Sequence, residues 1–247
     1  NLFENLIALE ILDLSFNSLI SIPKDYFKKN MAISSLYLNN NKINHIDLFI
    51  LQINNLIHTF IFANNNLTSF DFNLFLFSSS LVNLKKVNLR NNTIIELTNL
   101  DTPTDLDKNL DSIESLDLSF NYLSNVHFKF LFTNNNKLKS IQLNNNNLRY
   151  ININIFNIFI NIEDLNLEFN CIEKIEPYSF SSLDFLVELI LSNNNLSVLD
   201  NGTLDGLFQL RFLNLSKNHL EHIYSDLFAD LFSLLSLDLN YNKLKFL

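Results

Sequence analysis

Large apolar residues recur along the chain in one fixed arrangement, L-x-x-L-x-L-x-x-N-x-L, where L is any large apolar residue. The first copy has apolar side chains at Leu9, Leu12, Leu14 and Leu19 and an asparagine at Asn17. The alternating L-x-L core predicts a short strand in each copy, and a fixed period of this length predicts stacked repeats. Ten copies occur, and their ninth positions are Asn17, Asn41, Asn65, Asn92, Asn121, Asn146, Asn170, Asn194, Asn218 and Asn242.

Most copies have a second apolar half, with one large residue five positions after the asparagine and another ten positions after it. The pairs are Ile22 and Phe27, Phe70 and Phe75, Ile151 and Phe156, Ile175 and Phe180, Ile223 and Phe228, and, as a leucine version, Leu199 and Leu204. The copies are 24 residues apart in six of the nine steps. Over essentially the whole chain, this pattern resembles the leucine-rich repeat in its "typical" 24-residue class.

The resemblance implies an α/β-type repeat solenoid, a curved horseshoe with a concave parallel β-sheet and short convex segments that include few true helices. Residues 1–247 are then a single solenoid of about ten repeats, with longer repeats at 65–84 and 92–113. Phe3 and Leu6 fit the slots of a preceding repeat, and Leu247 stops in the middle of a coil. Because a solenoid needs polar caps at its ends, we expect the chain to be an excerpt truncated at both ends.

The ninth asparagine has a physical role in such a repeat. Its side-chain amide carries both an acceptor and a donor, so it can bridge backbone groups of its own coil and the adjacent one, which an aspartate cannot do. Leaving those groups unpaired would cost roughly 1–3 kcal/mol per site. In the stretch LYLNNNKI, Asn41 is therefore structural. We expect Asn39 and Asn40 to face solvent, where they reflect either a polar binding surface or the compositional bias of a chain with 43 asparagines.

The charge and composition exclude several classes of partner. A net charge of −9 and a pI near 4.9 disfavour nucleic acid and anionic membranes, which bind basic patches. No apolar run is long enough to span a bilayer, so no membrane contact is expected of this segment. Cys171 is the single cysteine, which leaves no internal disulfide. Two glycines and three prolines are too few for ordinary turns, so another residue must make them, and the abundant asparagine is the candidate.

One acidic stretch has the opening spacing of a calcium-binding loop. However, Leu110 stands where that loop needs glycine, and Leu116, a core residue of the next strand, stands where it needs glutamate. We therefore expect a solvated acidic loop. The spaced residues are Asp105, Asp107, Asn109 and Asp111.

Other motifs give no catalytic or metal site. His219 and His222 offer two metal ligands, but no third lies nearby in the sequence. Nucleophile motifs, glycine-rich phosphate loops and paired carboxylates in a pocket are all missing. We therefore predict that the protein is not an enzyme and has no cofactor or metal.

Five N-glycosylation sequons occur, which is about the number expected by chance for this composition, so they give no evidence for secretion. They begin at Asn66, Asn91, Asn195, Asn201 and Asn214.

The outward positions of the predicted sheet are the candidate binding surface, because neighbouring strands at about 4.8 Å would form a continuous strip. Opposed basic and acidic side chains there suit electrostatic recognition of a protein. The alternative is a soluble sheet whose charges pair with each other. Phe120 and similar aromatics before the ninth asparagine are interpreted as repeat consensus rather than binding residues. The predicted partner-binding residues are Tyr37, Lys86, Asn88, Arg90, Asp117, Tyr122, Gln142, Asp164 and Glu168.

The function predicted from the resemblance is non-catalytic protein recognition or adhesion through the concave face. Proteins with this repeat class include ectodomains of Toll-like receptors, chaoptin-like adhesion proteins and leucine-rich proteoglycans. The expected partner is a protein ligand or receptor partner, and the expected location is extracellular or at the cell surface. The unpaired Cys171 points mildly toward a reducing compartment. An intracellular scaffold or regulatory subunit and a structural spacer are the alternatives.

Overall fold

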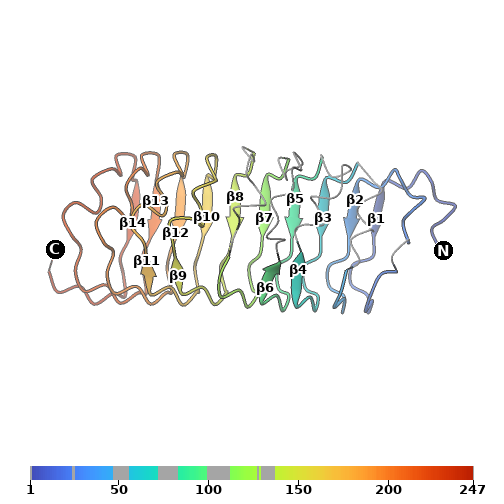
Figure 1. Cartoon of the computed structure of the whole chain (residues 1–247), viewed down its shortest axis with the longest axis horizontal. Helices are drawn as coiled ribbons and strands as arrows, with labels where there is room; N and C mark the ends of the chain where they lie inside the picture. The colour runs from blue at the N-terminus through green and yellow to red at the C-terminus, as the bar shows by residue number, and fades with distance from the viewer. Residues whose placement is uncertain are drawn as a thin grey trace. The chain divides into compact units, whose positions relative to one another are not determined.

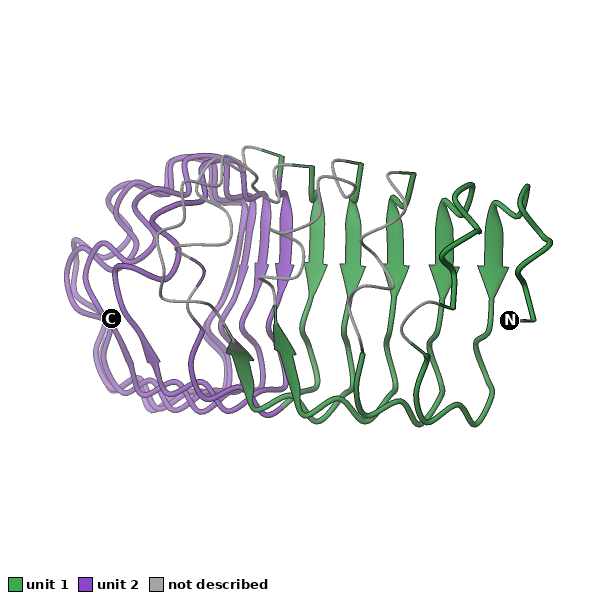
Figure 2. Ribbon diagram, turned by 45° about the vertical axis from the view of Figure 1, so that its right-hand side comes forward, with its two compact units in different colours: residues 1–121, 130–137 green, residues 122–129, 138–247 purple. Residues whose placement is uncertain are grey.

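The computed structural model describes residues 2–23, 26–46, 56–71, 83–98, 112–126, 128 and 137–246. The chain forms two compact units (Figure 2). Unit 1 contains residues 1–121 and 130–137, and unit 2 contains residues 122–129 and 138–247. The acidic stretch from Asp105 to Asp111 and most of both longer repeats lie outside the described residues.

The main sheet of unit 1 consists of parallel strands of three residues, one from each repeat (Figure 1). Strands from consecutive repeats pair in register, so that Leu12 lies beside Leu36, and Leu36 beside Phe60. The register continues from Phe60 to Val87 and Leu116. The strands are β1 (Ile11–Asp13), β2 (Ser35–Tyr37), β3 (Thr59–Ile61), β5 (Lys86–Asn88) and β7 (Ser115–Asp117).

The main sheet of unit 2 repeats this arrangement, with Ile141, Leu165 and Leu189 in register at the centre of successive strands. Leu213 and Leu237 continue the row. The strands are β8 (Ser140–Gln142), β10 (Asp164–Asn166), β12 (Glu188–Ile190), β13 (Phe212–Asn214) and β14 (Ser236–Asp238). The predicted parallel sheet of a repeat solenoid is thus confirmed in both units.

The second half of each repeat returns without forming a helix in the described residues. Two short parallel pairs form there instead. In unit 1, β4 (Ser69–Asp71) pairs with β6 (Glu96–Thr98), and in unit 2, β9 (Tyr150–Ile151) pairs with β11 (Lys174–Ile175). Within the part of the chain that the structure describes, no helix is long and apolar enough to cross a membrane.

The core lies between the strands and the returning segments. The middle residue of a main-sheet strand points inward, as Leu116 and Leu165 do with 0% exposure, while its two neighbours point outward. The predicted second-half residues meet them from the other side. Phe156 and Phe180 are fully buried and stack at 5.8 Å. Ile223 and Phe228, nearer the last strand, are only half-buried.

The ninth-position asparagines bond as bridges between coils. In unit 1, the Asn121 amide nitrogen donates to the carbonyls of Leu118 and Ser119 in its own coil and of Leu89 in the previous coil, at 3.0–3.2 Å. The Asn121 Oδ1 accepts the backbone N–H of Ile94 at 3.1 Å. Asn17 differs, because in the described residues its amide bonds only Leu14 and Ser15 of its own coil.

The residue before each of these asparagines has a left-handed backbone, with φ between 51° and 57°. Asparagine is one of the few residues other than glycine that tolerate this conformation. The asparagine directly before the bridging asparagine, which five repeats have, therefore has a backbone reason that the sequence interpretation missed. The ten residues are Phe16, Asn40, Asn64, Asn91, Phe120, Asn145, Phe169, Asn193, Lys217 and Tyr241.

Three of these asparagines also form a second ladder in unit 1. The amide nitrogen of Asn64 donates to Asn40 Oδ1 at 3.0 Å, and that of Asn91 donates to Asn64 Oδ1 at 2.7 Å. The Asn40 side chain is therefore half-buried and bonded to Asn64 rather than simply facing solvent.

Candidate functional site

The main-sheet face of each unit is built from the first and third residues of its strands, all of which are exposed or half-buried. In unit 1 the two rows are Ile11, Ser35, Thr59, Lys86 and Ser115, and Asp13, Tyr37, Ile61, Asn88 and Asp117. In unit 2 they are Ser140, Asp164, Glu188, Phe212 and Ser236, and Gln142, Asn166, Ile190, Asn214 and Asp238. The two faces differ in charge, and each is described separately.

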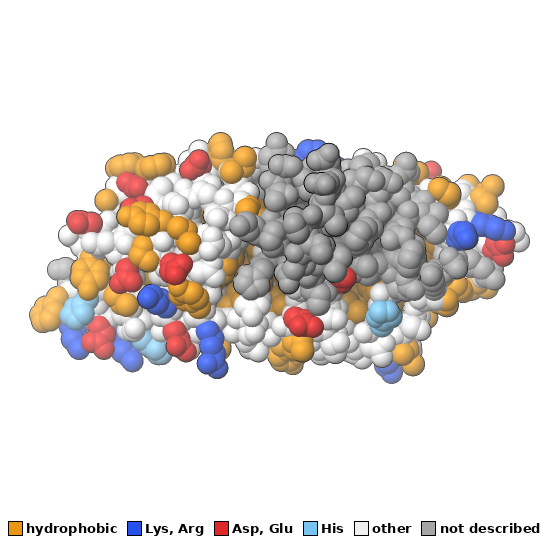
Figure 3. Space-filling model, viewed as in Figure 1, with side chains coloured by type: hydrophobic (Ala, Val, Ile, Leu, Met, Phe, Trp, Pro, Cys, Tyr) orange, Lys and Arg blue, Asp and Glu red, His pale blue; other side chains and the backbone are white. Residues whose placement is uncertain are grey.

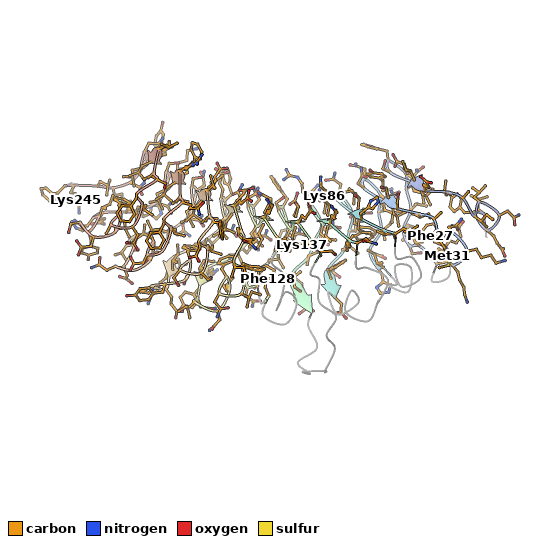
Figure 4. The ribbon with its side chains drawn as sticks, turned by 90° about the horizontal axis from the view of Figure 1, so that it is seen from above. Phe27, Met31, Lys86, Phe128, Lys137 and Lys245 are labelled. Atoms are coloured by element: carbon orange, nitrogen blue, oxygen red, sulfur yellow. The ribbon has the colours of Figure 1, made fainter. Side chains whose placement is uncertain are left out.

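Four of the predicted binding residues gather on β5 and β7 of unit 1. Lys86 is exposed on the main-sheet side, beside Ser115 in register, and is labelled in Figure 4. Asn88 lies beside Asp117 in the same way, and Arg90 follows β5. Tyr37 lies on β2, with β3 between it and β5.

Arg90 is held by the next coil rather than free in solution. Its Nη1 donates to Ser119 Oγ at 2.9 Å, and its Cζ lies 4.0 Å from the centroid of the Phe120 ring. The Ser119 hydroxyl in turn donates to Asp117 Oδ1 at 2.6 Å. Arg90 and Asp117 are therefore linked through one hydroxyl, and a guanidinium over an aromatic face contributes about 0.5–1 kcal/mol at an exposed site.

Asp117 also has a local role in the turn that follows its strand. Its Oδ1 accepts the backbone N–H of Ser119 at 3.0 Å. Such short-range side-chain bonds stabilise turns. The same i to i+2 bond is made by Asp13, Asn88, Asn166, Asn214 and Asp238.

In unit 2, two predicted residues contact each other directly. Gln142 Nε2 donates to Asp164 Oδ2 at 2.7 Å, and the Ser140 hydroxyl donates to the same oxygen at 3.0 Å. Glu168, which follows β10, accepts from the Ser192 hydroxyl at 2.8 Å and from Asn193 Nδ2 at 3.2 Å. The carboxylates of Asp164 and Glu168 thus have neutral donors as partners.

Asp164 has a second carboxylate beside it, because Glu188 is its register partner on β12. Burial raises the pKa of Asp164 above its ordinary value, against the lowering effect of its bonds from Ser140 and Gln142. Burial, and then the charge of Asp164, raise the pKa of Glu188. Loss of solvent disfavours the ionised form of both acids, and for Glu188 a neighbouring like charge acts in the same direction.

Other predicted positions lie off the main-sheet face. Tyr122 follows Asn121 in the bend and is 54% exposed. His219 is exposed one residue after Asn218, at the equivalent position of its own repeat. Among the described residues, no three His, Cys, Asp or Glu side chains are placed to hold a metal.

The sequence interpretation missed three residues on or beside these faces. Ser119 connects Arg90 to Asp117, and Phe120 was set aside as repeat consensus although it carries the Arg90 guanidinium. Glu188 was missed as well. The sequence could have indicated Glu188, because it stands one 24-residue repeat after Asp164 and therefore on the neighbouring strand.

Comparison with known families identifies the repeat. The leucine-rich repeat family model matches residues 7–56, 136–196 and 160–220. No curated protein matches the chain in a search by sequence.

Several solved structures share the fold. The chain is 28% identical to TLR13 in the crystal structure of its complex with ssRNA13, with a TM-score of 0.81, and the match covers 93% of this chain and 32% of TLR13. The Drosophila Toll–Spatzle complex gives 23% identity and a TM-score of 0.78, over 97% of this chain and 31% of the matched chain. The functional domain of InlJ from Listeria monocytogenes gives 20% identity and a TM-score of 0.70, over 99% and 47%. The chain thus spans about a third to a half of the length of these proteins.

Proposed function

This chain belongs to the leucine-rich repeat family, and we propose that its main-sheet faces bind a protein partner without catalysing a reaction. The face is the one predicted to be concave. The partner is a protein ligand or receptor partner, and the role is recognition or adhesion within the ectodomain of a cell-surface or secreted protein.

The observation that carries this proposal is the variety of side chains on the outward rows of the main sheets. The core positions are nearly all Leu, Ile, Val or Phe, whereas the outward positions change from repeat to repeat. Lys86 gives unit 1 a basic residue, and Asp164 and Glu188 give unit 2 an acidic pair. Such patterned charge on a rigid sheet suits specific recognition of a protein surface.

The extracellular location rests on the similarity to the Toll and TLR13 structures. The TLR13 structure contains an RNA, so RNA is the rival ligand for this chain. We propose a protein instead, because a net charge of −9 repels phosphates.

The test compares matched variants in a capture experiment with the immobilised chain and extract or secretions of the source organism. Lys86→Glu on the main-sheet face should reduce capture of a specific protein. Asp226→Lys, an exposed position on the returning side of unit 2, should leave it unchanged. Retained capture in Lys86→Glu and in Glu188→Lys, with loss in Asp226→Lys, would show that the main-sheet face is not the binding face. Recovery of RNA instead of a protein would show that the partner is a nucleic acid.

A further inference from the structure

The main-sheet face of unit 2 brings two carboxylates together on adjacent strands. Asp164 and Glu188 open β10 and β12 and are register partners. Strands in a sheet are about 4.8 Å apart, so both carboxylates lie within reach of one cationic group. The middle residues Leu165 and Leu189 are fully buried and fix this spacing.

Apolar side chains flank the acidic pair on the same face. Phe212 is the register partner of Glu188 on β13 and is 44% exposed. Ile190, two residues after Glu188, points outward on the same strand and is half-buried. A surface with adjacent carboxylates and exposed apolar groups fits a segment that has both cationic and apolar side chains, because an aromatic face also attracts a cation.

Among the described residues, neither carboxylate of this pair belongs to an ion pair. Lys139, just before β8, forms its ion pair with Glu163 at 2.7 Å. Arg211, just before β13, is exposed. Burial raises the pKa of Asp164 against its hydrogen bonds from Ser140 and Gln142, and burial followed by the charge of Asp164 raises the pKa of Glu188.

We propose that the main-sheet face of unit 2 binds a cationic segment of the protein partner, with a lysine or arginine seated between Asp164 and Glu188 and an apolar side chain against Phe212 and Ile190. This inference rests on the proposed function and specifies its partner. A cation between two carboxylates relieves their mutual repulsion, so binding lowers the free energy of a site that is unfavourable when empty. Phosphate-bearing partners are disfavoured by the same two charges.

A direct test uses a fluorescently labelled short peptide that alternates lysine and threonine and has one central phenylalanine. Its control is the same peptide with glutamate in place of lysine. Fluorescence anisotropy should show binding of the lysine peptide alone. The double variant Asp164→Asn with Glu188→Gln should raise its Kd about tenfold, since removing two opposed charges costs on the order of 1.4 kcal/mol or more. Asp226→Asn, which removes one exposed carboxylate elsewhere in unit 2, should change the Kd less than about twofold.

The proposal is overturned if the lysine peptide does not bind, if the double variant binds it as the wild type does, or if Asp226→Asn weakens binding equally. Melting curves show that the variants remain folded. The capture experiment separates this inference from the proposed function. If Lys86→Glu loses the partner while the double variant keeps it, main-sheet recognition stands and the cationic-segment site is wrong.

Discussion

The side-chain oxygen of Asn194 accepts the backbone N–H of Ile172, which lies in the preceding coil, at 2.9 Å. The nitrogen of the same amide donates to the carbonyls of Leu167, Leu191 and Ser192. One buried amide thus pairs four backbone groups at the point where the chain leaves the strand, and water does not reach that point, since Asn194 is 4% exposed. These bonds couple the repeat of Asn194 to the one before it.

Asn194→Ala should lower the free energy of unfolding by about 1–3 kcal/mol, because it leaves buried backbone groups unpaired. Asn195→Ala, whose side chain is exposed, should stay within about 0.5 kcal/mol of the wild type. Denaturant titration followed by circular dichroism measures both. Equal losses in the two variants would mean that the bridging bonds do not set the stability.

Lys217→Asn should stabilise the protein by about 0.5–1 kcal/mol, because Lys217 has a φ of 52° and asparagine tolerates this conformation better than lysine. The matched control is Lys243→Asn, which replaces an exposed lysine that lacks a positive φ. The control should have no measurable effect on thermal unfolding. A stabilised control with an unchanged Lys217→Asn would contradict the explanation for the asparagine that precedes each bridging asparagine.

Glu188→Gln should raise the melting temperature at neutral pH. The folded-state pKa of Glu188 is raised above 4.5, by burial first and then by Asp164. A group with a raised pKa contributes its full stability below its unfolded pKa and loses it as the pH rises through the folded value. The ionised carboxylate therefore costs stability at neutral pH, by about 0–1 kcal/mol at this largely exposed position.

The advantage of the Glu188→Gln variant should shrink as the pH is lowered to 4.5 and below. Glu221→Gln is the control of opposite sign, because Lys245 lowers the pKa of Glu221. It should not raise the melting temperature at neutral pH. A Glu188→Gln advantage that is the same at all pH values would exclude charge as its cause.

Asp117→Ala should destabilise the protein by about 0.5–1.5 kcal/mol, because the variant loses the acceptor for the Ser119 backbone and hydroxyl. Asp117→Asn should retain most of the stability, since Asn88 and Asn214 make the same backbone bond with an amide oxygen. The melting temperatures of Asp117→Ala and Asp117→Asn, compared with that of the wild type, test this prediction. If Asp117→Ala melts like the wild type, the carboxylate serves recognition alone.

The linear sequence determined the repeat, its register and the inward side of each strand. Leu12, Leu36 and Phe60 are paired as the 24-residue period predicts, because a period-two strand has only one apolar face to bury. The fixed period also identified the ninth-position asparagines as structural residues. A polar residue that returns at a fixed place in an apolar repeat must pair the backbone groups that the repeat buries.

The tertiary structure decided how the outward side chains are used. The charges of Arg90 and Asp117 could be read from the sequence, but their link through Ser119 depends on side-chain geometry across two coils. The left-handed φ of Asn40 was likewise hidden, because backbone conformation follows from the bend and not from composition. Asp164 and Glu188 became a pair only when stacking placed residues 24 positions apart on neighbouring strands, where burial raises the pKa of both and the charge of Asp164 also raises that of Glu188.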